Sequence, residues 1–126
     1  MKLLTGSYRN NISELERELR YAESFDMIEK KMTVAKLEIS FFYIDGFVKD
    51  GALQRIMQFL LSQKSLTTAK ETEAIIPYIE TRRESGIEAI ATAVLSGETA
   101  FLSESFGGEA IILDLRTYPT RSITEP

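Results

Sequence analysis

The sequence predicts an α/β domain in which a mixed β-sheet of about four to five strands is covered by about three to four helices. Apolar residues recur at every third or fourth position in some segments, as in amphipathic helices, and at every second position in others, as in strands. Gly, Pro and Asp residues separate these segments. Helical and strand patterns therefore alternate along the chain, although they do not determine the order of the strands.

The first third of the chain is expected to form a helix and a β-hairpin. Ser13 and Glu16 have the spacing of a capping box, and the apolar residues behind them recur at helical spacing, which predicts a helix over residues 13–23. Residues 26–33 predict a weaker strand, joined by a turn to a stronger strand that ends at Ile44. One face of the stronger strand is apolar, and the other becomes apolar along its length. This pattern indicates a strand that is covered on both sides toward its C-terminal end.

The middle of the chain predicts two helices. Asp50 is expected to cap the first, whose apolar stripe runs to Leu61 with polar residues on the opposite side. Thr68 and Glu71 repeat the capping-box spacing, so a second, shorter helix is expected directly after Thr68.

An extended segment and a further helix are expected next. Pro77 disfavours helical geometry in the residue before it, so residues 78–82 are expected to be extended. Ser85 and Glu88 form a third capping-box pattern, which predicts a helix behind them. This helix is expected to stop at Gly97, because glycine suits the left-handed position that follows many helices.

A closing hairpin is expected after this helix. Two apolar runs, residues 100–102 and 110–115, flank the pair Gly107-Gly108. No Lys-Ser or Lys-Thr follows the two glycines, and their flanks read as strands. We therefore interpret them as a hairpin turn and not as a phosphate-binding loop.

The hydrophobic periodicity divides the chain into three parts. Residues 1–23 form an N-terminal helical segment, residues 24–115 an α/β subdomain, and residues 116–126 an extended polar connector. Because the connector has no apolar repeat and ends on Ile-Thr-Glu-Pro, the sequence looks cut. We expect the connector to lead into a second subdomain that this chain does not contain.

The composition indicates a soluble domain and excludes several function classes. Nineteen acidic and fifteen basic residues give a net charge of −4, which argues against nucleic acid as a partner. The chain has no Cys and no His, so a disulfide framework, thiolate chemistry and a Ser–His–Asp triad are impossible. No apolar run approaches the ~20 residues of a spanning helix, and no signal peptide opens the chain. We expect an intracellular protein that is not an enzyme, with no cofactor and no metal.

Asp45-Gly46 is the first candidate site. It follows the most apolar strand, at the place where α/β sheets often put ligand-binding groups. Asp45 there would coordinate magnesium or hold a hydroxyl group at the mouth of a ligand cleft. The simpler interpretation, which we favour, is a turn between strand and helix in which Gly46 supplies a positive φ.

The connector is the second candidate site. Arg116, Tyr118, Pro119 and Arg121 alternate charges, a ring and a fixed φ directly after the last strand, whereas a flexible linker would be richer in Gly and Ser. One interpretation is a shaped connector that docks against a neighbouring domain, with its arginines reaching carboxylates or carbonyls. The other is an ordinary exposed tail, and the residues alone do not decide between the two.

Three segments carry a resemblance to a known family. YIDGFVKD (residues 43–50), VLSGETAFL (residues 94–102) and AIILDLRTYPTRSITEP (residues 110–126) resemble the soluble N-terminal domain of the A subunit of GerA-family spore germination receptors, a group that includes stage V sporulation protein AF. The resemblance covers the chain from about residue 24 onward. Thr120 stands where the family's ending has Gly. The residues that match this ending are Arg116, Tyr118, Pro119, Arg121, Ser122, Ile123, Glu125 and Pro126.

The resemblance implies a role in a membrane receptor. The chain would be the first half of a two-part soluble region, followed in the same subunit by a second subdomain and a membrane domain. Such receptors lie in the spore inner membrane, with this region on the spore-core (cytoplasmic) face, and work with B and C subunits to turn a nutrient signal into ion release. The chain would contribute assembly or signal relay, with homo-oligomers forming in the full subunit. The alternative is a module that binds a small nutrient. The expected contact residues are Arg116, Tyr118, Pro119, Arg121 and Glu125, and the expected ligand cleft is near Asp45 and Gly46.

Overall fold

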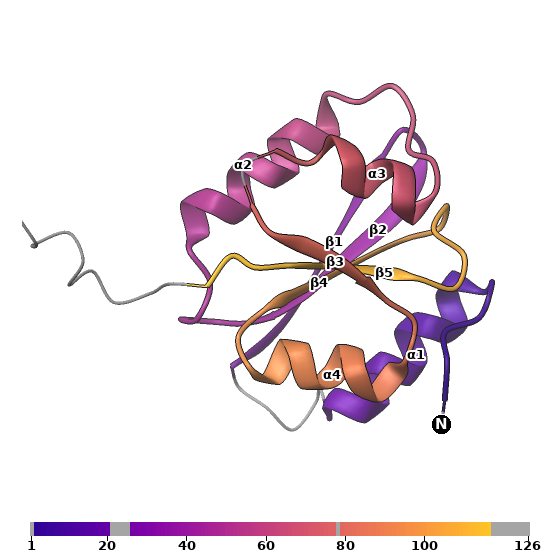
Figure 1. The fold of residues 1–126 in the computed structure, drawn as a ribbon, viewed down its shortest axis with the longest axis vertical. Helices are drawn as coiled ribbons and strands as arrows, with labels where there is room; N and C mark the ends of the chain where they lie inside the picture. The colour runs from indigo at the N-terminus through magenta and orange to yellow at the C-terminus, as the bar shows by residue number, and fades with distance from the viewer. Residues whose placement is uncertain (1, 21–25, 78, 117–126) are drawn as a thin grey trace, which may run out of the picture.

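The computed structural model describes residues 2–20, 26–77 and 79–116, which form four helices and five strands (Figure 1). The helices are α1 (Tyr8–Leu19), α2 (Asp50–Leu61), α3 (Ala69–Ile75) and α4 (Ile87–Leu95). The strands are β1 (Met27–Val34), β2 (Leu37–Ile44), β3 (Thr81–Glu84), β4 (Thr99–Ser103) and β5 (Ala110–Leu113). The predicted fold class, α/β with a single sheet covered by helices, is confirmed.

The sheet is antiparallel throughout, so the prediction of a mixed sheet was wrong in this detail. The strand order is β1-β2-β4-β5-β3, and each strand pairs antiparallel with its neighbours. β3 and β4, which α4 connects, both run antiparallel to β5. They point in the same direction but lie on either side of β5. The strand–helix–strand stretch therefore creates no parallel neighbours.

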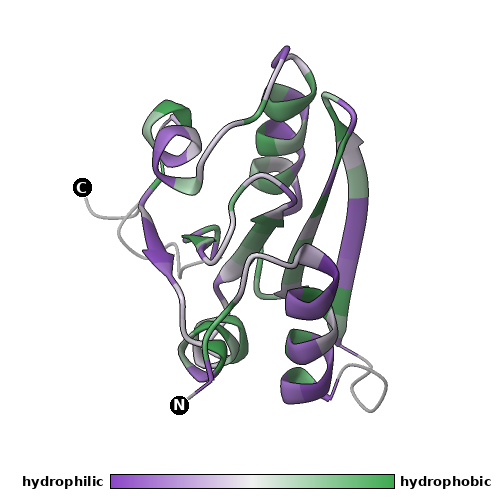
Figure 2. Cartoon of the chain, turned by 90° about the vertical axis from the view of Figure 1, so that its right-hand side faces the viewer, coloured by the Kyte–Doolittle hydropathy of each residue, from purple (hydrophilic) through white to green (hydrophobic). Residues whose placement is uncertain are grey.

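Helices cover both faces of the sheet. α2 and α3 lie on one face and α1 and α4 on the other (Figure 1). β2 contributes to both apolar layers: Ile39 and Phe41 face α2 and α3, and Phe42 faces α1 and α4. All three side chains are fully buried. The prediction that helices cover both sides of this strand is confirmed, and coloured by hydropathy the strands at the centre of the sheet are largely apolar (Figure 2).

Both predicted hairpins are present. β1 and β2 pair over their full length, with Ala35 and Lys36 at positive φ in the turn between them. β4 and β5 pair across the turn that contains Gly107, whose φ is +69°. The extended segment predicted over residues 78–82 overlaps β3 only at Thr81 and Arg82, because this strand starts at Thr81 and continues to Glu84.

The first helix starts earlier and ends earlier than predicted. Ser7, not Ser13, is its N-cap, and the Ser7 hydroxyl accepts a hydrogen bond from the Asn10 amide at 3.2 Å. The helix ends where Arg20 adopts a left-handed conformation, with φ and ψ both 50°. The first turn lacks an apolar repeat because polar contacts hold it: the Tyr8 hydroxyl bonds Ser40 of β2.

Two of the other helix starts differ from the prediction by one residue. Asp50 is the first helical residue of α2, and Lys49 is its N-cap. Gly86, not Ser85, is the N-cap of α4, and the N-terminal segment satisfies the first amide of this helix, since Ile87 N donates to the Lys2 carbonyl at 2.9 Å. The Thr68 cap of α3 is confirmed. None of the helices among the described residues is long and apolar enough to cross a membrane.

Candidate docking site where the chain leaves the domain

A tight turn follows β2 and forms one side of the candidate site. Phe47 N donates to the Ile44 carbonyl at 3.2 Å, and Asp45 N donates to the Asp26 carbonyl at 2.7 Å. Gly46 has a φ of +92°, a conformation that L-residues with side chains rarely adopt. The Asp45-Gly46 pair therefore closes a turn, as the favoured interpretation predicted.

The end of the described chain pairs with the residues after this turn. Lys49 N donates to the Leu115 carbonyl at 2.9 Å, and Val48 and Arg116 form an antiparallel bridge. Val48 and Leu115 are both buried in the layer under α2. The backbone is thus paired with the rest of the domain through Arg116, where the described residues end.

The end of α4 forms the third side of the site. Gly97 has a φ of +107° and follows the C-cap Ser96. A Cβ atom on Gly97 would lie 3.1 Å from Cδ of Arg116 and 3.1 Å from Cδ2 of Phe47. The aliphatic part of Arg116 and the ring of Phe47 therefore pack directly on the backbone of Gly97.

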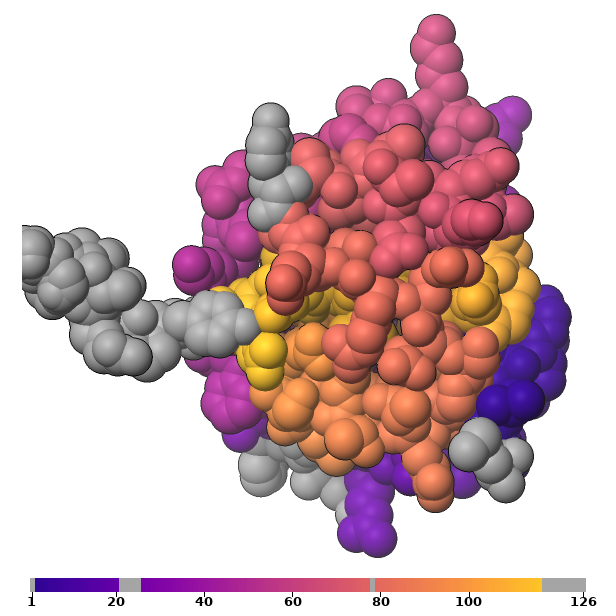
Figure 3. Space-filling view, viewed as in Figure 1, coloured from indigo at the N-terminus to yellow at the C-terminus, as the bar shows by residue number. Residues whose placement is uncertain are grey.

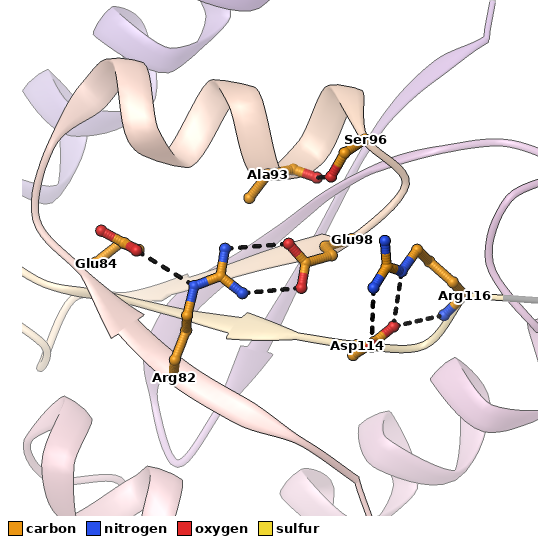
Figure 4. A network of polar contacts seen from close by, with 7 residues as sticks. All are labelled: Arg82, Glu84, Ala93, Ser96, Glu98, Asp114 and Arg116. Carbon is orange, nitrogen blue, oxygen red and sulfur yellow. Dashed lines mark hydrogen bonds and ion pairs between the residues drawn. The ribbon is translucent and has the colours of Figure 1, made fainter.

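An ion pair orients the guanidinium group of Arg116. Its Nε and Nη2 donate to the two carboxylate oxygens of Asp114 at 3.0 and 3.1 Å, and the Arg116 amide also donates to Asp114 at 3.3 Å (Figure 4). This bidentate geometry is the strong form of an Arg–carboxylate contact. The Asp114 side chain is only 13% exposed, so the pair is partly shielded from water.

A second bidentate pair lies beside the first. Arg82 of β3 donates to both carboxylate oxygens of Glu98 at 2.9 and 3.1 Å, and its Nε contacts Glu84 at 3.2 Å (Figure 4). The hydrogen bonds that Arg82 donates to Glu98 raise the pKa of Arg82 above its ordinary value. Glu98 is buried, so Arg82 supplies most of the compensation for its charge.

These elements surround an open hollow at the surface, with a volume of about 350 Å³, that Gly46, Phe47, Ser96 and Arg116 line. A second hollow of about 410 Å³ lies on the other side of Arg116, toward α2. The end of the described chain, just after β5, reaches the surface between the two helical layers (Figure 3). We call the group formed by Gly46, Phe47, Ser96, Gly97, Asp114 and Arg116 the exit surface.

The exit surface combines apolar and charged groups. The side chain of Phe47 is 50% exposed, and Leu95 at the end of α4 is 57% exposed. Burial, followed by the negative charges of Asp50 and Asp45, raises the pKa of Tyr43 in the adjacent strand. Among the described residues no group of three or more Asp or Glu side chains is arranged to hold a metal ion.

A family model for the Bacillus/Clostridium GerA spore germination protein matches residues 13–126. The chain belongs to the GerA family. The match begins inside α1, earlier than the point near residue 24 that the resemblance indicated, and includes the whole exit surface.

Two relatives define what this GerA-family chain is similar to. Stage V sporulation protein AF of Bacillus subtilis (strain 168) is 26% identical over 129 residues, which cover 94% of this chain and 26% of that protein. The chain therefore spans about a quarter of the length of that relative. The crystal structure of the N-terminal domain of the A subunit of the Bacillus megaterium spore germinant receptor GerK3 has the same fold, with a TM-score of 0.67 at 15% identity. That similarity covers 94% of this chain and 99% of the GerK3 chain.

The structure brings together two candidates that the sequence treated separately. Arg116 of the connector and Gly46 of the predicted ligand cleft line the same hollow, whereas Asp45 does not line it. The other connector candidates, Tyr118, Pro119, Arg121 and Glu125, lie outside the described residues.

Sequence reasoning missed Phe47, Gly97 and Asp114 as parts of the site. Asp114 carried a usable signal, because residues two apart in a strand share one side, and this places Asp114 beside Arg116. Phe47 carried a weaker one, as an aromatic residue directly after a turn. Gly97 was correctly predicted to stop α4, but nothing local indicated that it lies against Arg116.

Proposed function

We propose that this GerA-family chain is the first soluble, non-catalytic domain of a germinant receptor A subunit, or of its stage V sporulation protein AF-like counterpart, and that it docks on the next domain of the same subunit through the exit surface. The observation that carries the proposal is that Arg116, the last described residue, is held firmly against the domain. Arg116 is held by a backbone bridge, by a bidentate ion pair and by packing on Gly97. A segment that only tethers two independent domains needs none of these contacts.

The composition of the exit surface supports a protein partner. Phe47 supplies an exposed ring next to charged groups that already have partners, so a second surface buries apolar area without leaving a charge uncompensated. In the receptor this contact links the domain to the second subdomain and, through it, to the membrane domain. The domain then contributes to assembly with the B and C subunits on the core side of the spore inner membrane, and relays the nutrient signal toward ion release.

Paired leucine variants test the proposal in the full-length subunit. Leu95 and Leu61 are 57% and 56% exposed, but Leu95 ends α4 beside the exit surface and Leu61 ends α2 away from it. Leu95→Asp, and separately Phe47→Asp, are expected to weaken interdomain contact, measured as faster proteolysis after residue 116. Germination of spores that carry these variants is expected to slow, while Leu61→Asp behaves as wild type.

The same experiment can reject the proposal. Equal proteolysis rates and equal germination for Leu95→Asp, Phe47→Asp and Leu61→Asp would show that the exit surface has no docking role. Chemical shifts of the isolated 126-residue chain provide the folding control, because a variant that unfolds the domain carries no information about docking.

The second candidate function is that of a small-ligand module, and the hollow beside Gly46 and Arg116 is the observation in its favour. Among the described residues that line this hollow, Arg116 carries the formal charge, and a ligand carboxylate would compete with Asp114 for its guanidinium group. Calorimetric titration of amino acids, sugars and nucleotides into a protein that contains both soluble domains decides between the two functions. Heat that disappears in Arg116→Gln supports ligand binding, and the absence of heat with every compound rejects it.

A further inference from the structure

Glu29 of β1 is a buried acidic residue outside the exit surface. It lies two residues after Met27, on the sheet face that packs under α1, and opposite Phe42 of β2. Its side chain is 3% exposed, and its Oε2 atom has no hydrogen-bond partner among the described residues. Lys31 Nζ is the nearest cation, 3.7 Å away, but its side chain is 66% exposed. An ionised carboxylate at this position is poorly compensated.

The acidic group that acts on Glu29 is Glu16 of α1, which lines the same hollow as Lys31. It directly follows Leu15, which is fully buried against the sheet. Two carboxyl groups form a hydrogen bond only when one of them carries a proton. Burial first, then the hydrogen bond and the charge of Glu16, raise the pKa of Glu29 from 4.5 to about 7, against a smaller opposing effect of Lys31.

Other charged groups line a hollow at the α1–hairpin boundary together with Glu16. A hollow of about 450 Å³ separates the outer part of α1 from the β1–β2 hairpin and the loop after β4. The ionisable groups that line it are Tyr8, Arg9, Glu16, Lys31, Glu38 and Glu104. Three carboxylates and two cations face the hollow, so the cations there do not neutralise a second charge on the buried pair.

We propose that Glu16 and Glu29 share one proton across the boundary between α1 and β1, and that this proton holds α1 against the sheet. When the proton is lost, two carboxylates face each other in a buried interface and repel. The docking of α1 on the sheet and on α4 then weakens, while the strands keep their pairing and α2 and α3 keep their contacts. This inference uses no residue of the exit surface and is independent of the proposed function.

The direction of the pH effect follows from proton linkage. When α1 detaches, Glu29 meets water and regains its ordinary pKa, so the docked state binds the proton more tightly. The contribution to docking is fully present below about pH 4.5 and is lost as the pH rises to about 7. Within this window one proton changes the docking equilibrium by at most about tenfold per pH unit.

Amide hydrogen exchange of the 126-residue chain tests the proposal. Protection factors, corrected for intrinsic exchange, are measured between pH 5 and pH 8 for α1 and for β4 as an internal reference. In the wild type, α1 protection is expected to fall by up to about tenfold per unit until about pH 7, while β4 protection changes little. In Glu29→Gln the α1 profile is expected to be flat, because the amide does not titrate. The exposed Glu18→Gln on the same helix is the matched control and is expected to follow the wild type.

A side-chain carboxyl titration by NMR keeps the test decisive if Glu29→Gln does not fold. Glu29 is expected to titrate near pH 7 in the wild type, and Glu16→Gln is expected to move that midpoint to lower pH by removing the like charge. A midpoint near 4.5 would overturn the proposal, and so would pH-independent α1 protection in the wild type. A midpoint that Glu16→Gln leaves unchanged would show that burial alone acts on Glu29 and that no proton is shared.

Discussion

Gly97 is the residue on which the packing of the exit surface depends. Its φ of +107° is unfavourable for any L-residue with a side chain, and the two nearest heavy atoms to a Cβ there belong to Arg116 and Phe47. Backbone conformation and close packing therefore both require glycine at this position.

We expect Gly97→Ala to lower the free energy of unfolding by about 1–3 kcal/mol. Gly51→Ala is the matched control: Gly51 lies in α2, and only Arg55 Nη1, at 4.0 Å, is near its Cβ position. Alanine there is expected to stabilise by about 0.5–1 kcal/mol. Urea denaturation of both variants measures the difference, and equal effects would contradict this account of Gly97.

Arg82 and Arg83 offer a comparison between adjacent arginines with different partners. Arg82 compensates the buried Glu98, whereas the partners of Arg83, Glu73 and Glu109, are 21% and 38% exposed. We expect Arg82→Ala to cost about 1–3 kcal/mol and Arg83→Ala less than about 1 kcal/mol, because water replaces the lost partner only at the exposed sites. A double-mutant cycle of Arg82 with Glu98 checks the assignment, and a coupling energy near zero would contradict it.

At the scale of secondary-structure elements, the helix starts differ in what satisfies their first amides. Thr68 caps α3 with its side chain, which accepts a hydrogen bond from Glu71 N at 3.2 Å. The start of α4 has no side-chain cap, since the N-terminal segment lies across it and the Lys2 carbonyl accepts from Ile87 N.

This difference predicts that alanine at the two capping-box positions lowers the free energy of unfolding by different amounts. Thr68→Ala is expected to reduce the free energy of unfolding by about 1 kcal/mol, and Ser85→Ala by less than about 0.5 kcal/mol. Chemical denaturation measures both values. A cost for Ser85→Ala as large as that for Thr68→Ala would mean that the Ser85 side chain caps α4 after all.

Deletion of residues 2–6 is expected to destabilise the start of α4, which Ser85→Ala is not expected to do. It removes the Lys2 carbonyl and the Leu4 amide, which bonds the Ser85 carbonyl at 2.8 Å. We expect α4 to lose amide protection at its first turn while α3 keeps its own. Unchanged exchange in α4 would show that the N-terminal segment contributes nothing to this helix.

At the scale of the whole molecule, the inner strands join the two halves of the core, and β4 is an example. In β4, Phe101 points toward α2 and α3, and Leu102 points toward α1 and α4. Phe101 stacks on Phe41 with ring centroids 4.8 Å apart and meets the edge of Phe106 at 5.0 Å. A substitution that shifts the packing of one layer therefore also shifts the β4 backbone, on which the other layer packs.

We expect the domain to unfold in one cooperative step, and Phe101→Ala to cost about 3–5 kcal/mol. Far-ultraviolet circular dichroism and tyrosine fluorescence should report the same midpoint in wild type. Separate transitions for the α1–α4 layer and the α2–α3 layer would show instead that the halves of the core are independent.

Local patterns predicted what local contacts determine. Period-two alternation located β1 and β2, and the glycine pair located the closing hairpin, because both depend on neighbours along the chain. The start of α1 was wrong because its first turn is held by Tyr8 against Ser40 on β2, a contact with no trace in helical periodicity. The mixed sheet was wrong because no local signal places β5 between β3 and β4.

The candidate site was predictable only in part for the same reason. Gly46 and Arg116 were each visible as a turn residue and a connector residue, but their meeting depends on the bridge between Val48 and Arg116. Such a pairing between distant segments leaves no periodic signal. The docking role of Tyr118, Pro119, Arg121 and Glu125 stays a prediction.

The strand order also fixes when this fold becomes possible during synthesis. β4 and β5 are the last strands to leave the ribosome, yet they occupy the interior of the sheet, between β2 and β3. The β1–β2 hairpin has no inner neighbour until β4 has emerged at residue 103, and β3 has no partner strand until β5 has emerged at residue 113. The nascent chain therefore completes its sheet only a few residues before the exit surface itself is made. The sheet and the exit surface are therefore completed together, late in synthesis of this chain.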